Sequence, residues 1–172
     1  IAQNRLKGVG FLSREDAINY GVTGPSGRGS GWACDVRKRS PYAAYDKVQF
    51  DEVLYNEGDS YARYMVRMKE IEQSLHILEQ LVDNIPEGDY LAKTKPIIKV
   101  PEGRYFKEVE AARGAFGIYL ESRGDKFPYR LKVNSPGFNL VGAVDHMTRG
   151  SKIADLIAIG GSLDYVVPDI DR

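Results

Sequence analysis

Apolar residues recur at helical spacing along one long segment, from about Asp59 to Asp83. Charged residues fill the rest of the helical circumference, so the pattern predicts an amphipathic helix whose apolar stripe packs into the core. The positions in this stripe are Tyr61, Met65, Met68, Ile71, Leu75, Leu78 and Val82.

Alternation of apolar with other residues predicts a β-hairpin over residues 115–133, with its turn at Arg123-Gly124-Asp125. Pro128 lies in the returning segment and has no N–H to donate, so this strand is expected at the edge of the sheet. The alternating positions are Phe116, Ile118 and Leu120 in the first strand and Tyr129, Leu131 and Val133 in the second.

Shorter elements surround these two. Ser13 and Gly21 are suited to cap the start and end of a short helix. The stretch Gly24–Gly31 carries four glycines in eight residues, which predicts a loop and neither a helix nor a strand. Two further short helices are predicted at about 139–148 and 151–159. Residues 1–172 are therefore expected to form a single α+β domain.

Composition narrows the function classes. The chain has 24 Lys and Arg against 24 Asp and Glu, a balance that argues against a nucleic-acid binder. The one basic run, Arg37-Lys38-Arg39, is interpreted as a solvated loop. A single cysteine, Cys34, excludes an internal disulfide, a cysteine-rich zinc site and an iron–sulfur cluster.

No apolar run approaches the roughly 20 residues that cross a bilayer, and no signal peptide is recognisable. The expectation is a soluble or peripheral protein. Because the sequence starts at Ile1 without a methionine, we also expect it to be a fragment of a longer chain.

The sequence contains none of the common nucleotide-binding or metal-binding motifs that were considered. The glycine-rich stretch fits neither the Walker loop nor the dinucleotide fingerprint. His76 and His146 lie in no metal-ligand spacing. Arg113, Asp164 and Asp169 lie in apolar or glycine-rich surroundings, where a charge is costly unless it is paired or used. Two interpretations are open: Arg113 forms a buried salt bridge with one of the two carboxylates, or these charged residues belong to a functional site.

Read as a string, the chain resembles the C-terminal half of the D subunit of the proton-pumping NADH:quinone oxidoreductase, respiratory complex I. The resemblance extends over nearly all 172 residues and rests on the order and spacing of many short motifs. These motifs are Gly24-Pro25, Arg28-Gly29-Ser30-Gly31, Asp35-x-Arg37-Lys38, Pro41-Tyr42-x-x-Tyr45-Asp46, Gly58-Asp59, Arg63-Tyr64-x-Val66-Arg67, Glu110-Ala111-x-Arg113-Gly114, Ser135-Pro136-Gly137-Phe138, Asp145-x-Met147-x-Arg149-Gly150, Ala154-Asp155, Asp164-x-Val166 and Asp171-Arg172.

That family is similar in turn to the large subunit of nickel–iron hydrogenases, so the resemblance implies a hydrogenase-like α+β fragment with a cavity-lining C-terminal tail. The hydrogenase signature S-x-D-P-C-x-x-C lays its cysteines on Val166 and Asp169. Valine cannot coordinate nickel, and one carboxylate does not replace soft thiolates. A hydrogenase activity is therefore nearly excluded, and no metal ligand is expected in this chain.

What the resemblance implies instead is a quinone headgroup pocket, in which Arg113, Asp164 and Val166 are the residues carried over most directly. Asp169, Arg172 and Gly161 follow as further pocket residues. The histidine and tyrosine that hydrogen-bond the quinone in this family lie in its N-terminal half, so no catalytic residue is expected in this fragment. On its own the fragment is expected to be inactive.

The resemblance also implies the surroundings of the chain. The substrate is quinone, while FMN and the iron–sulfur clusters are carried by partner subunits. The partners are the other peripheral-arm subunits, including the one with the terminal cluster, and the membrane arm. The expected location is peripheral, on the cytoplasmic side of the bacterial inner membrane or the mitochondrial matrix side. An assembly module without quinone contact is the alternative.

Overall fold

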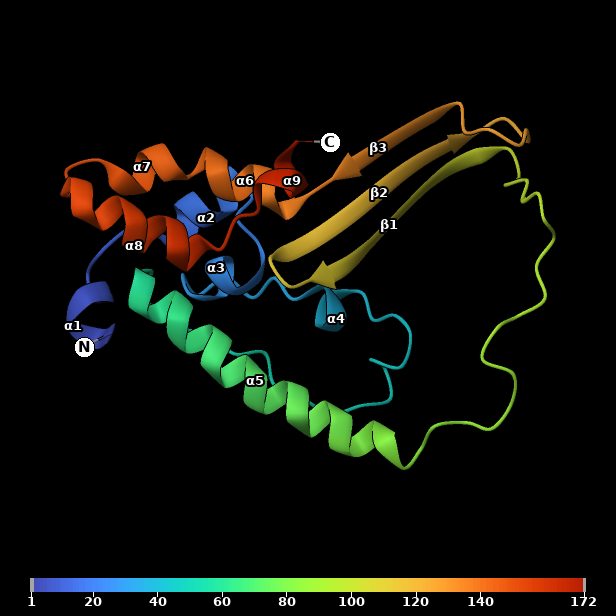
Figure 1. Cartoon of the computed structure of the whole chain (residues 1–172), viewed down its shortest axis with the longest axis horizontal. Helices are drawn as coiled ribbons and strands as arrows, with labels where there is room; N and C mark the ends of the chain where they lie inside the picture. The colour runs from blue at the N-terminus through green and yellow to red at the C-terminus, as the bar shows by residue number, and fades with distance from the viewer. Residues whose placement is uncertain (1, 172) are drawn as a thin grey trace.

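The structure is a computed structural model that describes residues 2–171. A body of helices lies beside one end of a three-stranded antiparallel sheet, whose other end extends away from it (Figure 1). The arrangement is thus α+β. The helices are α1 (Ala2–Leu6), α2 (Arg14–Tyr20), α3 (Gly24–Arg28), α4 (Val36–Arg39), α5 (Ser60–Val82), α6 (Pro136–Gly142), α7 (Val144–Thr148), α8 (Ile153–Leu163) and α9 (Val167–Ile170).

The sheet has the order β1 (Gly103–Ala111), β2 (Gly114–Ser122), β3 (Arg130–Asn134). The predicted hairpin is confirmed as β2 and β3, with Leu120 opposite Leu131. β3 lies at the edge, and its pairing begins only after Pro128, as the missing N–H requires. Strand β1 was not predicted, because charged residues interrupt any alternation along it.

The long helix is confirmed as α5, and its N-terminus is capped by Asp59, whose carboxylate accepts a hydrogen bond from the Ala62 N–H at 2.7 Å. The prediction that its apolar stripe forms the core is wrong. Met68, Ile71, Leu75, Leu78 and Val82 are between 43% and 63% exposed. The opposite face of α5 packs inward instead, because its small and polar residues fit the loops beneath it.

That inward face carries the buried residues Ala62 and Val66 and two glutamines. The Gln73 side chain accepts a hydrogen bond from the Asp51 N–H, and the Gln80 side chain bonds the backbone of Gln49 in both directions. Backbone groups of residues 49–51 therefore find their partners on α5. The C-terminal half of the helix is thus held by these hydrogen bonds together with the buried Ile77.

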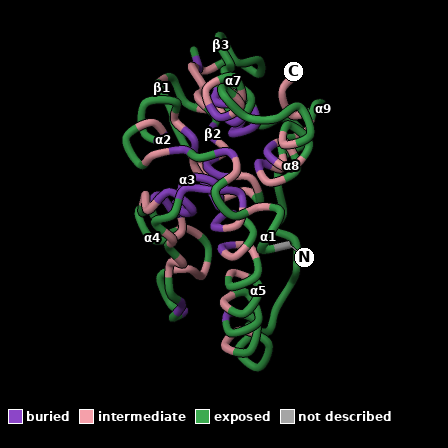
Figure 2. The backbone as a smooth tube through the Cα atoms, turned by 90° about the vertical axis from the view of Figure 1, so that its left-hand side faces the viewer, coloured by how far each residue is buried: buried purple, intermediate pink, exposed green. Residues whose placement is uncertain are grey.

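The main core lies among α2, α6, α7 and α8. In Figure 2 the buried segments gather around α3 and the interior of the helical body, whereas the outer side of α5 is exposed. The core residues, all 3% exposed or less, are Leu12, Ala17, Val22, Leu140, Ala143, Met147, Ile159 and Leu163. Val48, Phe50 and Ile77 form a smaller cluster under the far half of α5.

The two segments predicted as loops contain helical turns. Gly24–Arg28 forms α3, with Pro25 in its first turn, and every residue of this turn is buried. Val36–Arg39 forms α4, capped by Asp35. Within the basic run Arg37 is mostly buried, because it pairs with Asp35 at 2.7 Å. Burial and pairing, which a composition argument does not contain, account for both corrections.

The remaining helix predictions are confirmed. Ser13 caps α2 through the N–H of Asp16, and Gly21 ends it in the left-handed conformation. The stretch predicted as one helix over 139–148 is helical but divided at Ala143 into α6 and α7, and α8 continues past the predicted end at residue 159 to Leu163. Among residues 2–171, no helix combines the length and the apolar character that crossing a membrane requires.

Candidate functional site

The candidate site is built on the tip of the β1–β2 hairpin, where Ala112 and Arg113 form the turn. The tip packs against the start of α3, where the backbones of Gly24 and Gly114 lie in close contact. A Cβ on Gly24 would lie 2.5 Å from the Cα of Gly114, and one on Gly114 would lie 2.4 Å from Thr23 Oγ1. Both glycines also have positive φ, at 69° and 134°. The position of Arg113 thus depends on two residues without side chains.

Arg113 contacts the C-terminus of α8. Its Nε donates to the backbone carbonyl of Asp164 at 3.1 Å, and its Nη2 lies 3.4 Å from Asp164 Oδ1. The side chains are 35% and 46% exposed. The pair that the sequence left open is therefore present, but it is accessible to solvent and not buried. Its carboxylate and guanidinium remain available to a further ligand.

Asp164 has an unusual backbone conformation. It ends α8 with φ 56° and ψ 39°, a left-handed conformation that is uncommon for residues other than glycine. Asp and Asn adopt it more readily than bulkier residues. The turn directs the chain from α8 toward Val166 and α9.

A small cavity lies between the hairpin tip and the C-terminal tail. It has a volume of about 190 Å³ and brings together three of the expected pocket residues, Arg113, Val166 and Asp169. Its other lining residues are Ala111, Ala112, Phe116 and Pro136. The cavity is thus mainly apolar, with one cation and one carboxylate on its wall.

Asp169 is held in place by the start of α6. Its Oδ2 accepts hydrogen bonds from the hydroxyl of Ser135 and from the Gly137 N–H, the latter at 3.2 Å. A Cβ on Gly137 would lie 2.5 Å from the same carboxylate oxygen. The motif Ser135-Pro136-Gly137 therefore fixes the tail, and the carboxylate is engaged within the chain.

The other expected residues lie elsewhere. Gly161 lies in the last turn of α8 and lines a second cavity of about 270 Å³, together with Ser60, Tyr64 and Arg67. A Cβ there would meet nothing within 4 Å, so no close approach inside this chain requires the glycine. Arg172 lies outside the described residues.

The sequence interpretation assigned no role to Arg63, although it quoted the motif that contains it. The Arg63 side chain is fully buried and donates to the carbonyls of Gly10 at 2.8 Å and Gly58 at 3.0 Å and to Ser162 Oγ at 2.9 Å. It thereby joins the N-terminal segment, α5 and α8. A signal was available, because an arginine on the inward face of a helix must find buried acceptors.

Arg67 lies one turn further along α5 and approaches Asp164. It donates to the carbonyl of Arg63 at 3.0 Å and to that of Leu163 at 3.4 Å. Burial lowers the pKa of Arg67, while the Asp164 carboxylate acts in the opposite direction. The carboxylate of Asp164 therefore interacts with two cations, Arg113 and Arg67.

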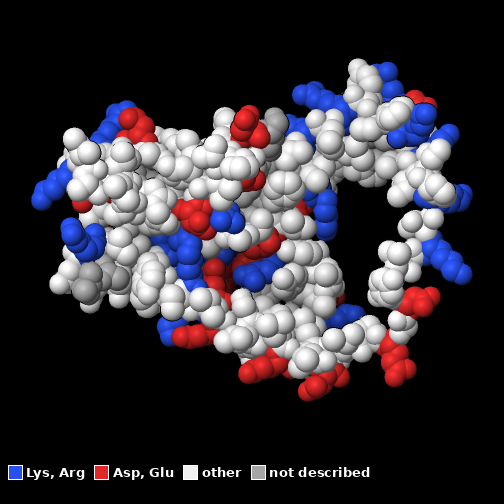
Figure 3. Space-filling model, in the orientation of Figure 1, with Lys and Arg blue, Asp and Glu red and all other residues white. Residues whose placement is uncertain are grey.

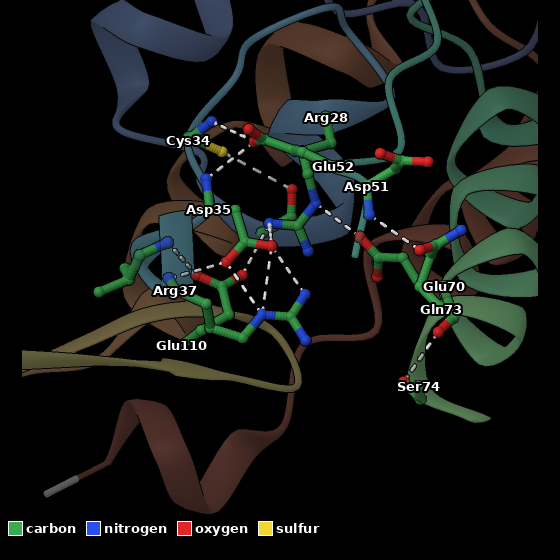
Figure 4. A network of polar contacts seen from close by, with 12 residues as sticks. Arg28, Cys34, Asp35, Arg37, Asp51, Glu52, Glu70, Gln73, Ser74 and Glu110 are labelled. Carbon is green, nitrogen blue, oxygen red and sulfur yellow. Dashed lines mark hydrogen bonds and ion pairs between the residues drawn. The ribbon is translucent and has the colours of Figure 1, made fainter. Parts of the chain in front are cut away.

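Arg28 is the centre of a buried ionic network (Figure 4). Its Nε lies 2.6 Å from Glu70 and its Nη1 lies 2.7 Å from Glu110, while Asp35 is 3.9 Å away. Burial alone would lower the pKa of Arg28, but the carboxylates of Glu70 and Glu110 outweigh it and raise that pKa. The network links α3, α5, α4 and β1, and so supports the hairpin that carries Arg113.

Glu110 joins this network to the candidate site. Its second oxygen accepts from the Val36 N–H at 3.0 Å, and burial raises the pKa of its carboxyl group. It lies on β1, three residues before Arg113. When one partner of such a buried ion pair is removed, the remaining charge is buried without compensation, and the folded state is strongly destabilised.

Metal ligands are not gathered at the site. Within residues 2–171, no three or more His, Cys, Asp or Glu side chains lie close enough together to hold a metal ion. A larger open cavity of about 570 Å³ lies along residues 94–99. It is lined by a single segment and lies apart from the charged groups described above.

Comparison with known proteins shows similarity over the whole length. The sequence matches the family described as the 49 kDa subunit of respiratory-chain NADH dehydrogenase over residues 1–99 and 94–172. It is 68% identical over 172 residues to the C/D subunit of NADH-quinone oxidoreductase from Phocaeicola vulgatus and 69% identical to that from Bacteroides fragilis. It is 54% identical over 173 residues to the D subunit from Desulfotalea psychrophila.

All of this chain is covered in each of these comparisons, but only part of each relative. The chain spans 33% and 32% of the two C/D proteins and 46% of the Desulfotalea psychrophila protein. The order and spacing of motifs noted in the sequence are thus explained by common descent. The chain belongs to the family of the 49 kDa subunit of respiratory-chain NADH dehydrogenase.

Proposed function

We propose that this chain is part of the quinone-binding subunit of an NADH:quinone oxidoreductase and forms one wall of the quinone headgroup pocket. The observation that carries the proposal is the cavity that joins Arg113, Val166 and Asp169 from the hairpin tip and the C-terminal tail. A quinone headgroup is a flat ring with two carbonyl oxygens. It calls for apolar walls and a few polar groups that fix its orientation.

The cavity has that composition. Ala111, Ala112, Phe116 and Val166 supply apolar surface, and the guanidinium of Arg113 can donate to a carbonyl oxygen. Its volume of about 190 Å³ is below the roughly 300–1,000 Å³ of complete ligand pockets. The rest of the pocket is therefore assigned to other parts of the subunit or to its partners.

Asp164 serves this wall as a positioning residue. Its carboxylate and its backbone carbonyl both hold the guanidinium of Arg113. Its carboxylate also interacts electrostatically with Arg67 and is half-exposed to solvent. We assign to the Arg113–Asp164 pair the orientation of the headgroup and part of its proton supply.

The wider assignments follow from the same proposal. The complex transfers electrons from NADH through FMN and iron–sulfur clusters on partner subunits to quinone, coupled to proton translocation. This chain, as a single domain of a longer subunit, binds neither NAD nor metal, and it contacts the other peripheral-arm subunits and the membrane arm. It lies at the cytoplasmic face of the bacterial membrane, or at the matrix face in mitochondria.

One observation favours the alternative, an assembly module without quinone contact. Exposed cations gather at the end of the sheet that is far from the cavity (Figure 3). They are Arg104 on β1, Arg130 on β3, and Arg123 and Lys126 in the connection between β2 and β3. Such a surface is suited to an acidic partner.

Cysteine protection in the assembled complex separates the two functions. Val166→Cys and Val167→Cys place thiols at adjacent positions, one on the cavity wall and the other on a side chain that is 65% exposed. We expect a bound quinone analogue to slow modification of Val166→Cys several-fold and to leave Val167→Cys unchanged. Equal rates with and without the analogue would support the assembly module instead.

A further inference from the structure

Arg67 on α5 lies between the candidate site and the buried ionic network around Arg28. At the candidate site its charge attracts Asp164 and is opposed by that of Arg113. In the buried network its charge attracts Glu70 and is opposed by that of Arg28. The two groups of charges thus have one partly buried arginine in common.

Hydrogen bonds hold the guanidinium of Arg67 at the C-terminus of α8. Its Nη1 donates to the carbonyl of Arg63 at 3.0 Å, and its Nη2 donates to the carbonyl of Leu163 at 3.4 Å. Leu163 is the last residue of α8, where the carbonyl groups lack partners within the helix. A cation is favourable there, because the helix dipole places partial negative charge at this end. Arg67 thus stabilises the helix end that leads into Asp164.

Arg67 and Arg113 act on Asp164 in different ways. Arg113 contacts the Asp164 carboxylate directly, at 3.4 Å. The hydrogen bonds of Arg67 go to carbonyl oxygens, and its interaction with Asp164 is one of charge. Because Asp164 directly follows Leu163 in a left-handed turn, a shift of the Leu163 carbonyl would move both groups of Asp164 that bind Arg113.

We propose that Arg67 is a positioning residue for quinone reduction, which acts through Asp164 and thereby orients Arg113. The inference rests on the proposed function, because it assigns a role at the same wall of the quinone pocket. Arg67 lines the separate cavity of about 270 Å³, together with Ser60 and Tyr64. It is therefore assigned no contact with the headgroup.

Two substitutions separate the charge of Arg67 from its hydrogen bonds. Arg67→Gln removes the charge and keeps an amide donor, whereas Arg67→Lys keeps the charge and loses the planar guanidinium. In the assembled complex we expect kcat for quinone reduction to fall about fivefold with Arg67→Gln and less with Arg67→Lys, while KM for NADH stays the same. Arg149→Gln is the control, because this side chain is 76% exposed, and it should keep wild-type activity.

A double-mutant cycle in the assembled complex tests whether Arg67 acts through Asp164. The loss of kcat in Arg67→Gln/Asp164→Asn should be well below the product of the two single losses, because residues that act as a unit are not additive. A loss equal to that product would mean that Arg67 acts independently, and it would overturn the inference. Wild-type activity of Arg67→Gln would overturn it as well.

The same measurements distinguish positioning from a purely structural role. We expect the amount of assembled complex to stay the same while kcat per complex falls. Loss of assembled complex with unchanged kcat per complex would overturn the inference, and where Arg67→Gln does not assemble, Arg67→Lys carries the cycle with Asp164→Asn. A multiplicative cycle with a slow Asp164→Asn contradicts only the role of Arg67. Wild-type activity of Asp164→Asn contradicts the role of Asp164 in the proposed function too.

Discussion

The guanidinium of Arg113 contacts both the backbone carbonyl and the carboxylate of Asp164, although the two residues are 51 positions apart. This contact joins the tip of the β1–β2 hairpin to the end of α8. Because Asp164 is in a left-handed conformation and the tip rests on Gly24, neither side of the contact is a regular helix or strand. Two irregular turns thus meet where the cavity lies.

Asp164→Asn tests the role of this contact. Asparagine keeps the shape and tolerates the left-handed conformation, but it loses the charge that faces Arg113 and Arg67. We expect kcat/KM for quinone to fall by about tenfold, or ~1.4 kcal/mol, with assembly unchanged. Steady-state quinone reduction by the complex measures this. Asp145→Asn is the control, because its pair with Arg149 is about three-quarters exposed. Equal activity of both variants and wild type would refute the role.

Val166→Met tests the shape of the wall. A longer side chain would occupy part of a cavity of about 190 Å³. Sensitivity to quinone-site inhibitors should shift several-fold while the amount of assembled complex stays the same. Val167→Met adds the same atoms at a position that is 65% exposed, so its inhibitor response should remain that of wild type. A shift of the same size in both variants would count against the placement of Val166.

Gly114→Ala tests the docking of the hairpin tip. The new methyl group would lie 2.4 Å from Thr23 Oγ1, and alanine disfavours the φ of 134°. Strain of this kind costs about 1–3 kcal/mol, so we expect slower quinone reduction and a lower melting temperature of the full-length subunit. Gly142→Ala is the control, since a Cβ there meets nothing within 4 Å. If both variants melt like wild type, the tip does not depend on this approach.

Arg28→Met tests the buried network. The change leaves Glu70 and Glu110 without their cation, and the loss of one partner from a buried pair costs about 3–5 kcal/mol. Arg39→Met breaks the more exposed pair with Glu108, whose side chains are 49% and 24% exposed, and should cost about 0–1 kcal/mol. The two variants are compared by urea unfolding of the full-length subunit. Similar losses of unfolding free energy would show that Arg28 is not the centre of the network.

The pKa of Asp35 predicts a pH dependence. Burial alone would raise this pKa, but hydrogen bonds from Arg37 and the charge of Arg28 hold it below its ordinary value. The stabilising effect is therefore present above the pKa of the unfolded chain and is lost as the pH falls through the folded value. Asp35→Asn keeps the cap of α4 and removes this effect. The difference in unfolding free energy between wild type and Asp35→Asn should shrink from pH 7 toward pH 3, and a constant difference would contradict the assignment.

The periodicity of apolar residues predicted the long helix α5 and the hairpin of β2 and β3. The caps Ser13 and Gly21 were readable because capping is local chemistry. The stripe on α5 was misplaced, since periodicity does not distinguish which of two faces meets the chain. Strand β1 and the turn α3 depend on pairing and backbone contact with distant residues, and no local pattern encodes them.

Only part of the candidate site could be predicted, because it too depends on contacts between residues that are distant in the sequence. Resemblance supplied Arg113, Val166 and Asp169, and the structure brings these three to one cavity. Spacing could not reveal that Asp164 meets Arg113, or that Gly161 belongs to a different surface. Those relationships arise from the docking of the hairpin tip on Gly24, which depends on the tertiary fold.

Photoaffinity labelling of the assembled complex with a quinone analogue tests the central claim most directly. The reactive group belongs on the quinone ring, and the adducts are mapped by peptide mass spectrometry. The account predicts labelled residues within 111–116 and 164–169, and loss of labelling when excess quinone competes. Specific labelling confined to residues outside this chain would contradict it.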